Sequence, residues 1–375
     1  MDKVSEADVY LPPLSSRVND ARMTKNEWLI KYYQFRKYHK DSRTLVKDAK
    51  HFQESLGKNS SDLANRFRGS LLGLAVGDAL GTTLEFSSRE PTDQHSEMIG
   101  EGPFHLKPGQ WTDDTSMALC LAYSLYNKHR FSAQDQMDLY VQWWQQGLFS
   151  STGSCFDIGN TVVSALKAYQ SSGDPFSGSC EEQSAGNGAL MRLSPIVLYY
   201  ASDASEAIHW AGQSSRTTHQ NVQSVDACRL MAAIILGALY GESKDNILRA
   251  MYSPIDSYWQ YHPLCEQVKQ IANGSYKTKN RSQIESTGYV IHSLEAALWA
   301  FFNSNSFESG MIKAVNLAGD SDTIGAIYGQ IAGAYYGELG IPFKWIKSLS
   351  EFHYFYFFAD EFVSYYSGKP INPSG

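Results

Sequence analysis

Two acidic side chains and two hydroxyl side chains stand next to one another in the segment GQWTDDTSMAL. Thr112, Asp113, Asp114 and Thr115 come directly before an apolar run with helical spacing. A helix start needs only one capping side chain, and adjacent carboxylates repel each other. Capping therefore leaves the second acid unexplained.

A second segment, NLAGDSDTIGAIYGQIAG, places Asp320, Asp322 and Thr323 at the start of another expected helix. The four carboxylates of the two segments carry −4, whereas a helix dipole supplies only about half a positive charge at each N-terminus. If the two helix starts face each other, two divalent cations would balance this charge. Oxygen ligands favour Mg²⁺ or Mn²⁺, and the sequence has no His-x-x-x-His or Cys cluster for zinc.

From the residues alone, two interpretations of these acid pairs remain open. Each pair could be a capping feature of its own helix. The shared pattern of acid, acid and hydroxyl before a helix, found twice, favours a metal site instead. A site with two metals orients water or a substrate diol, so hydrolysis of a phosphoester and of a glycosidic bond both fit.

The elements that must position these acids are predicted to be helices. Apolar residues recur at helical intervals in separate runs bounded by Gly, Ser, Asn or Pro, namely 70–81, 116–129, 133–147, 160–170, 222–241, 288–302 and 323–340. No set of alternating β-branched runs competes with them, which predicts an all-α fold. Gly325, Gly329, Gly333 and Gly337 repeat every fourth residue and predict very close packing of a buried helix.

Composition excludes several classes of protein. The hydrophobic share of 43% and charged share of 19% are typical of a globular protein. Five widely spaced cysteines argue against a disulfide framework, and Cys120 is expected in the core. We expect no membrane span, because no apolar run reaches about 18 residues, and no N-terminal export signal is present. These features predict a cytoplasmic protein.

The charge divides the chain into two parts. Residues 17–50 hold ten Lys/Arg and four Asp/Glu, which gives this segment a charge of +6. Since the whole chain has a net charge of −7, the remaining residues carry −13. An acidic body is not expected to bind nucleic acid. Gly, Asn and Ser in 56–66 are interpreted as a linker. We therefore divide the chain into a basic, aromatic extension, 1–65, and a helical domain, 66–375.

Six motifs occur in an order that resembles the ADP-ribosylglycohydrolase family, most closely its branch of dinitrogenase reductase-activating glycohydrolases. They cover about residues 66–340 and read GLAVGDALGTTLEF, GQWTDDTSM, TGSCFDIGNT, GNGALMRLSP, THQN and LAGDSDTIGAIYGQIAGAYYG. The resemblance implies an all-α fold with a central cleft that holds two Mg²⁺ or Mn²⁺ ions. It also implies hydrolysis of the bond that joins ADP-ribose to a protein side chain, in this branch usually arginine.

The resemblance assigns roles to the acidic residues. The implied metal ligands are Thr112, Asp113, Asp114, Asp320, Asp322 and Thr323, and the implied catalytic residues are Asp114, Asp157 and Asp320. Asp157 matches a family acid near the scissile ribose, where a carboxylate suits a guanidinium group. Without the resemblance, Asp157 would be interpreted as the cap of the helix that follows it. Asp78 is interpreted as structural.

The resemblance also implies a set of substrate contacts. Gly186, Asn187 and Gly188 match a loop that cradles phosphates, where the start of a following helix would add a favourable field. His219 corresponds to a position near the ribose, with a structural hydrogen bond as the alternative. Glu85 matches an acid near the substrate; in relatives that act on serine-linked ADP-ribose such an acid can gate the site. The remaining contacts are expected along the adenosine diphosphate or ribose, at Gly153, Ser154, Cys155 and Phe156.

The extension carries an aromatic run, from Trp28 to Tyr38, and three interpretations of the extension remain open. It could pack on the body as an extra helix, or it could bind a protein partner, since interfaces favour Tyr, Trp and Arg. As a third interpretation, its basic residues could bind nucleic acid, which a steep loss of binding with added salt would support. Some members of the family resemble immunity proteins that pair with ADP-ribosyltransferase toxins. The expected partners are thus an ADP-ribosylated protein and, through residues 1–65, a cognate transferase, which the protein would also inhibit by binding.

Overall fold

The computed structural model describes residues 62–367, and the regular structure in this part of the chain is helical. The prediction of an all-α fold is confirmed. Extended pairing within these residues is limited to isolated bridges, such as that between Glu85 and Gly319. In chain order the α-helices are α3 (Asp62–Gly81), α4 (Asp113–Lys128), α5 (Ala133–Gln146), α6 (Asn160–Ser172), α7 (Ser194–Tyr199), α8 (Ala204–Arg216), α9 (Val222–Leu239), α10 (Lys244–Ile247), α11 (Tyr258–Tyr261), α12 (Glu266–Ala272), α13 (Val290–Phe302), α14 (Phe307–Val315), α15 (Ser321–Tyr336), α16 (Phe343–Ser348) and α17 (His353–Ser367).

All seven predicted helices are present, as α3, α4, α5, α6, α9, α13 and α15. Sequence periodicity did not reveal several others, of which α17 is the longest. Its aromatic run HYFYFFADEFVSYYS has residues that favour strands. It is nevertheless helical, because Phe355, Phe358 and Phe362 fall on one face and are buried together in the core.

The expected linker over 56–66 is wrong in its second half. Residues 62–66 form the first turn of α3, where the Arg66 guanidinium donates to the Asp62 carboxylate at 2.8 Å. Arg66 also donates to the carbonyl oxygens of Ala238 and Tyr335, both at 2.9 Å. The start of α3 is thus tied to the ends of two other helices. Residues 1–61, which hold most of the basic extension, lie outside the described residues.

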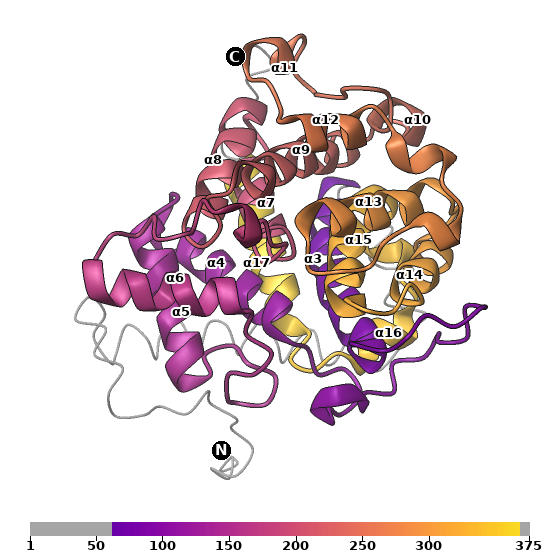
Figure 1. The fold of residues 1–375 in the computed structure, drawn as a ribbon, viewed down its shortest axis with the longest axis horizontal. Helices are drawn as coiled ribbons and strands as arrows, with labels where there is room; N and C mark the ends of the chain where they lie inside the picture. The colour runs from indigo at the N-terminus through magenta and orange to yellow at the C-terminus, as the bar shows by residue number, and fades with distance from the viewer. Residues whose placement is uncertain (1–61, 368–375) are drawn as a thin grey trace, which may run out of the picture.

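Two glycine-rich helices, α3 and α15, form the centre of the molecule. Figure 1 shows them side by side, with α4, α5 and α6 on one flank and α13 and α14 on the other. A Cβ atom at Gly73 would lie 2.2 Å from the carbonyl oxygen of Gly329, and one at Gly77 would lie 2.0 Å from that of Gly325. The predicted close packing of the glycine repeat is confirmed, and its partner is a second glycine repeat in α3, at Gly69, Gly73, Gly77 and Gly81.

Helix α9 departs from the expectation that no segment could span a membrane. Its 18 residues are long and apolar enough to do so by length and composition, but 83% of that window is buried inside the protein. The helix also carries Asp226 and Arg229, whose side chains form an ion pair at 2.6 Å. In this structure α9 is a core helix, packed between α8, α13 and α15.

We predict that Gly329→Ala strongly destabilises the protein. Its Cβ would lie 1.9 Å from the carbonyl oxygen of Gly73, so the two helix backbones must separate. The expected loss is about 3 kcal/mol or more, at the upper end of overpacking effects. Thermal or denaturant unfolding measures it. Gly159→Ala is the control, because apart from its chain neighbours no atom lies within 4 Å of the added Cβ. Equal stability of the two variants would contradict the close contact.

Candidate active site

The two acidic helix starts predicted from sequence face each other. Asp113 and Asp114 lie in the first turn of α4. Asp322 lies in the first turn of α15, two residues after the N-cap residue Asp320. The Thr323 hydroxyl of α15 lies 3.5 Å from Oδ2 of Asp114, so the two starts are in direct reach of each other. The acid pairs of α4 and α15 are therefore close enough for their negative charges to be balanced by shared cations.

Neither acid pair makes the N-cap hydrogen bond of its own helix, although Oδ1 of Asp322 accepts the backbone N–H of Thr323 at 2.7 Å. The N-cap residue of α4 is Thr112, and its side chain makes no capping hydrogen bond. The start of α4 is instead bound by Asp78 of α3. Its carboxylate accepts from the backbone N–H groups of Thr112 and Thr115, at 2.9 and 3.0 Å, and from both hydroxyls, at 3.0 and 2.6 Å. The structural role expected for Asp78 is confirmed, and Asp113 and Asp114 are free for another task.

The start of α15 is capped from a distance in the same way. Oε2 of Glu85 accepts the backbone N–H of Ser321 at 2.8 Å. Carboxylate oxygens of Glu85, Asp320 and Asp322 lie within 4.8 Å of one another. Glu85 was expected to contact substrate, and the structure adds that it belongs to a group of three acids that could hold a metal ion.

The charge of this cluster is not balanced by basic side chains. Within residues 62–367 no Lys, Arg or His forms an ion pair with any of seven acids that influence one another electrostatically, which are Asp78, Glu85, Asp113, Asp114, Asp157, Asp320 and Asp322. Oδ1 of Asp114 and Oδ2 of Asp322 are sealed from solvent without a hydrogen-bond partner. Burial, followed by the neighbouring carboxylates, raises the pKa values of Glu85, Asp113 and Asp114.

These observations fit a site for divalent cations. A buried oxygen without a partner costs free energy, and several repelling carboxylates in one cavity cost more. Hard cations with oxygen ligands remove both penalties at once. The hydroxyls of Thr112 and Thr323 reach Oδ2 of Asp114, so all six predicted metal ligands lie at or beside the two helix starts.

Asp157 does not cap the helix that follows it, which was the alternative to a role in the site. Helix α6 begins after Gly159, which is its N-cap residue, and no side chain caps it. Asp157 itself has φ 57°, a left-handed conformation that Asp tolerates better than most residues. Burial, and then the charges of Asp113 and Asp322, raise the pKa of the Asp157 carboxyl. The structure thus brings Asp157 to the acid cluster.

In the loop between α5 and α6, Cys155 lies near the acids of the site, whereas Gly153 and Ser154 make hydrogen bonds within the loop. The pKa of the Cys155 thiol is raised by burial and next by Asp113 and Asp157, which argues against a thiolate nucleophile. Gly153 and Ser154 bond within the loop, through the Gly153 N–H and the Ser154 carbonyl to Ser150. All five cysteines of the chain are free.

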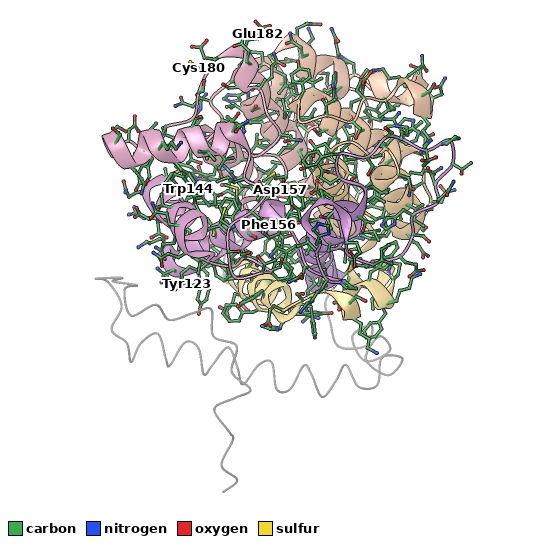
Figure 2. The ribbon with its side chains drawn as sticks, turned by 60° about the horizontal axis from the view of Figure 1, so that its bottom comes forward. Tyr123, Trp144, Phe156, Asp157, Cys180 and Glu182 are labelled. Carbon is green, nitrogen blue, oxygen red and sulfur yellow. The ribbon has the colours of Figure 1, made fainter. Side chains whose placement is uncertain are left out.

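A short row of aromatic rings borders the site. The ring of Phe156 lies 5.4 Å from that of Phe104, which lies 6.2 Å from that of Phe86. Phe86 follows Glu85 directly and is 71% exposed. Figure 2 shows Phe156 and Asp157 together near the middle of one face of the molecule. The row offers an apolar surface next to the acids.

The predicted phosphate loop lies beside the acid cluster, but its helix is absent. The Asn187 side chain donates to Oδ2 of Asp320 at 2.7 Å and to the Ser293 hydroxyl at 2.8 Å. The prediction that a helix begins directly after Gly188 is wrong. Residues 188–192 form turns, and α7 begins only at Ser194, with a proline in its first turn. The backbone N–H of Gly186 already donates to Ser184.

His219 lies directly under this loop. A Cβ atom at Gly186 would lie 3.1 Å from Nε2 of His219, and one at Gly188 would lie 2.9 Å from Cε1. On the other side of the ring, Nδ1 lies 2.9 Å from the Thr218 hydroxyl. The predicted loop and the predicted histidine are therefore in contact, and the structural hydrogen bond considered as an alternative is present as well.

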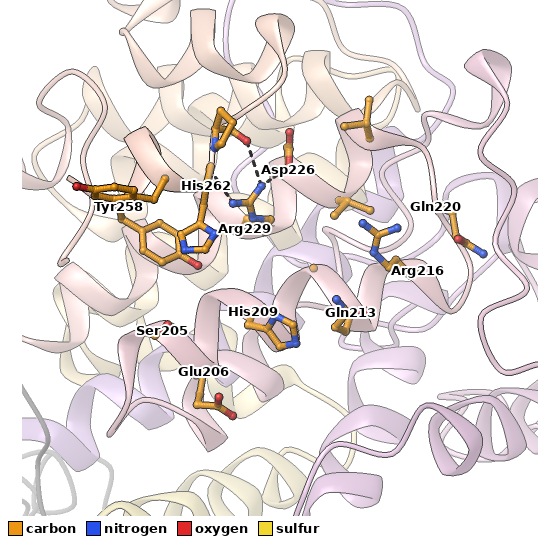
Figure 3. A pocket seen from close by; sticks show the side chains of 15 residues that line it. Ser205, Glu206, His209, Gln213, Arg216, Gln220, Asp226, Arg229, Tyr258 and His262 are labelled. Atoms are coloured by element: carbon orange, nitrogen blue, oxygen red, sulfur yellow. Dashed lines mark hydrogen bonds and ion pairs between the residues drawn. The ribbon is translucent and has the colours of Figure 1, made fainter. Parts of the chain in front are cut away.

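A separate groove of about 650 Å³ lies on the outer face of α8, α9 and α11. Figure 3 shows its side chains, among them His209, Arg216 and Tyr258. None of the residues predicted for the site lines it. Its Arg229 is already bound to Asp226 and to the carbonyl oxygen of His262. The groove therefore lies apart from the acid cluster and shares none of its residues.

Sequence reasoning missed three contributions to this site. It did not assign the capping by Glu85, the link from Asn187 to Asp320, or the aromatic residues Phe86 and Phe104. Each depends on contact between segments far apart in the chain, and no local pattern signals it. Only the position of Phe86 next to Glu85 could have drawn attention.

Comparisons with known proteins agree with this geometry. A family model described as ADP-ribosylglycohydrolase matches residues 59–370. The chain is 40% identical over 286 residues to the ADP-ribosylarginine hydrolase Tri1 of Pseudomonas putida (strain GB-1), covering 76% of this chain and 74% of that protein. It is 32% identical over 292 residues to the ADP-ribosyl-[dinitrogen reductase] glycohydrolase of Rhodospirillum rubrum, covering 76% and 90%. A solved structure described as an ADP-ribosylglycohydrolase-related protein complex matches with a TM-score of 0.71 and 38% identity, covering 81% of this chain and 98% of that one.

We predict that Asp322→Asn stabilises the metal-free protein and removes its response to metal. An amide at this position relieves repulsion and can donate to Glu85, so in EDTA the variant should gain about 1 kcal/mol, as active-site replacements often do. Mg²⁺ or Mn²⁺ should raise the melting temperature of the unaltered protein but not that of Asp322→Asn.

Asp226→Asn is the control. This acid is also buried but is paired with Arg229, so the variant should lose stability and keep the metal response. A metal-induced shift retained in Asp322→Asn would contradict the site.

Proposed function

The chain belongs to the ADP-ribosylglycohydrolase family, and on that premise we propose that it removes ADP-ribose from arginine side chains of modified proteins, in the cytoplasm. That it is a hydrolase of this family follows from the match over most of the chain. The arginine linkage is proposed because two relatives at about 40% identity are named ADP-ribosylarginine hydrolase. The single observation in the structure that carries the proposal is the buried, unbalanced acid cluster beside Asp157.

The acids at the two helix starts are proposed to hold two Mg²⁺ ions, with Mn²⁺ as an alternative. The ligands would be Thr112, Asp113, Asp114, Asp320, Asp322 and Thr323, and Glu85 is close enough to join them. When bound, such cations supply positive charge that orients ribose hydroxyls and activates water. This donor set fits them because its two sealed carboxylate oxygens have no other partner.

The chain's own residues are proposed to act on the two sides of the scissile bond. On one side, Asp157 holds the guanidinium of the modified arginine, which offers paired N–H donors to a carboxylate. As the C–N bond breaks, positive charge develops on the ribose, and the surrounding carboxylates stabilise it. Water adds to the anomeric carbon, so that its hydroxyl stays on ADP-ribose and its proton leaves with the guanidine. On the other side, Gly188, His219 and Phe156 contact the ADP portion. Burial, and then the neighbouring acids, raise the pKa of Asp157, and a cationic guanidinium beside it would restore the charged form.

Release of free ADP-ribose tests this proposal. The purified protein is incubated with a target ADP-ribosylated on arginine, with Mg²⁺ or with EDTA, and the products are analysed by mass spectrometry. Metal-dependent release of ADP-ribose is expected. Release only from a target modified on serine would correct the linkage. Release of phosphate or AMP with an intact glycosidic bond would assign the site to phosphoester hydrolysis.

Asp320→Ala and Asp114→Ala should each abolish turnover, by about 10³-fold or more, while the circular dichroism spectrum stays helical. The reason is that each removes a carboxylate at the point where the two helix starts meet. Asp203→Ala is a matched control, since this acid only caps α8 on the surface. Near-normal turnover in either Asp320→Ala or Asp114→Ala would overturn the dinuclear site.

For the extension we propose a separate role, binding of a cognate ADP-ribosyltransferase toxin, so that the protein both reverses the modification and inhibits the transferase. The charge of +6 over residues 17–50 and the aromatic run from Trp28 to Tyr38 support it. An inhibitor that acts by binding alone would still protect cells when Asp320 is replaced. These residues lie outside the part of the chain that the structure describes.

Deletion of residues 1–60 should abolish binding of the transferase and leave release of ADP-ribose within about twofold of normal. The acids of the site all lie in 78–322, and α3 begins at Asp62, so the deletion removes no residue of the described helical body. Binding is measured by calorimetry and release by mass spectrometry. Undiminished binding by the shortened protein would assign the contact to the body instead.

A further inference from the structure

Arg192 is a buried cation without an anionic partner. It is 1% exposed, and no carboxylate in residues 62–367 forms an ion pair with it. The guanidinium lies 4.6 Å from the centre of the Tyr140 ring, and Nη1 contacts the Met117 sulfur at 3.7 Å. Nη2 donates to the Thr218 hydroxyl at 2.6 Å. Burying an arginine with so few partners is costly, which raises the question of what it does.

The bond from Arg192 determines the direction of the next bond. Arginine can only donate, so the Thr218 oxygen must accept from it. The hydroxyl hydrogen of Thr218 then remains to be donated, and Nδ1 of His219 lies 2.9 Å away. If Nδ1 carried a hydrogen instead, the Thr218 oxygen would accept twice and its own hydrogen would have no described acceptor. The network therefore favours an Nδ1 that carries no hydrogen and accepts a hydrogen bond from the Thr218 hydroxyl.

A neutral imidazole with a bare Nδ1 carries its hydrogen on Nε2. The buried position of His219 and the nearby Arg192 guanidinium lower the histidine pKa to about 3, so the ring stays uncharged. Nε2 has no hydrogen-bond partner among the described residues. His219 is only 2% exposed, and its Nε2 lies on the side of the ring that faces Gly186 and Gly188.

The free Nε2 faces the loop proposed to hold phosphates. Nε2 would lie 3.1 Å from a Cβ atom added at Gly186 and 3.3 Å from one added at Gly188. We propose that Arg192 and Thr218 are positioning residues that hold His219 as the neutral tautomer with hydrogen on Nε2, so that this N–H donates to a phosphate oxygen of ADP-ribose bound at residues 186–188. The identity of the ligand rests on the proposed function; the tautomer does not.

The arrangement supplies a directed donor without placing a cation at the surface of the loop. A mobile lysine or arginine there would bind the neighbouring carboxylates, since Asn187 of the same loop already contacts Asp320. A neutral N–H can bind an anionic oxygen and leaves the acids available for cations. Arg192 thus acts on the ligand only through Thr218 and His219.

The tautomer is tested directly by NMR of the full chain labelled with ¹⁵N-histidine, with the signal assigned by its loss in His219→Gln. Long-range ¹H–¹⁵N spectra should show His219 as a single neutral form with hydrogen on Nε2, without any ligand. Adding ADP-ribose and Mg²⁺ should shift the Nε2 signal, and adding adenosine should not. A hydrogen on Nδ1 in the unaltered protein would overturn the proposal, with no variant needed.

Three variants separate positioning from general structural damage. Thr218→Val removes the hydroxyl and should give mixed tautomers and about tenfold weaker binding of ADP-ribose by calorimetry, the effect of one hydrogen bond to a charged oxygen. Thr218→Ser keeps the hydroxyl and should restore both readouts. Thr217→Val removes a buried hydroxyl bonded to Gln136 and Ser214, and should leave the tautomer unchanged.

The outcomes distinguish this proposal from the proposed function. An unchanged tautomer or unchanged affinity in folded Thr218→Val would overturn the positioning role. A protein that shows the expected tautomer but releases no ADP-ribose from any target would refute the proposed function and leave the relay from Arg192 to His219 standing.

Discussion

Backbone contact between α3 and α15 is the constraint on which the site depends. Glycines at every fourth position of both helices let the two backbones touch, and any side chain there would overlap a carbonyl group. The contact ends at Gly81, whose carbonyl oxygen accepts from the Ser321 hydroxyl at 2.8 Å. The end of one helix is thus joined to the start of the other. The conformational entropy lost by these glycines is offset by the close packing they permit.

This contact explains why capping residues come from neighbouring segments. Asp78 lies one turn before the end of α3 and reaches the start of α4, while Glu85, just after α3, reaches the start of α15. Acids outside the two motifs therefore satisfy three backbone N–H groups at these helix starts, those of Thr112, Thr115 and Ser321. The motif acids have no cationic partner, so their mutual repulsion destabilises the protein without metal. A bound cation would remove this repulsion.

The same centre connects the acid cluster to the loop at residues 186–188. Asn187 binds Asp320 and Ser293, and the backbone N–H of Asn187 donates to the carbonyl of Gly288, so the loop is held against both α13 and α15. His219, at the turn between α8 and α9, supports the loop from below. A substrate with a ribose at one end and a diphosphate at the other would contact both halves of this connected unit.

The sequence by itself determined the helical class, the seven main helices, the close packing of the glycine repeat in α15 and the acid pairs of the site, because these are local patterns of periodicity and adjacent charge. That α3 is the partner of this glycine repeat was decided by the tertiary structure. Family motifs added the identity of Asp157 and His219. Tertiary structure alone decided that Asp78 and Glu85 do the capping, that Asp157 does not, that no helix follows Gly188, and that Arg192 orients His219. Each of these is a contact or a competition between distant segments, and no spacing along one chain encodes which acceptor a given N–H finds.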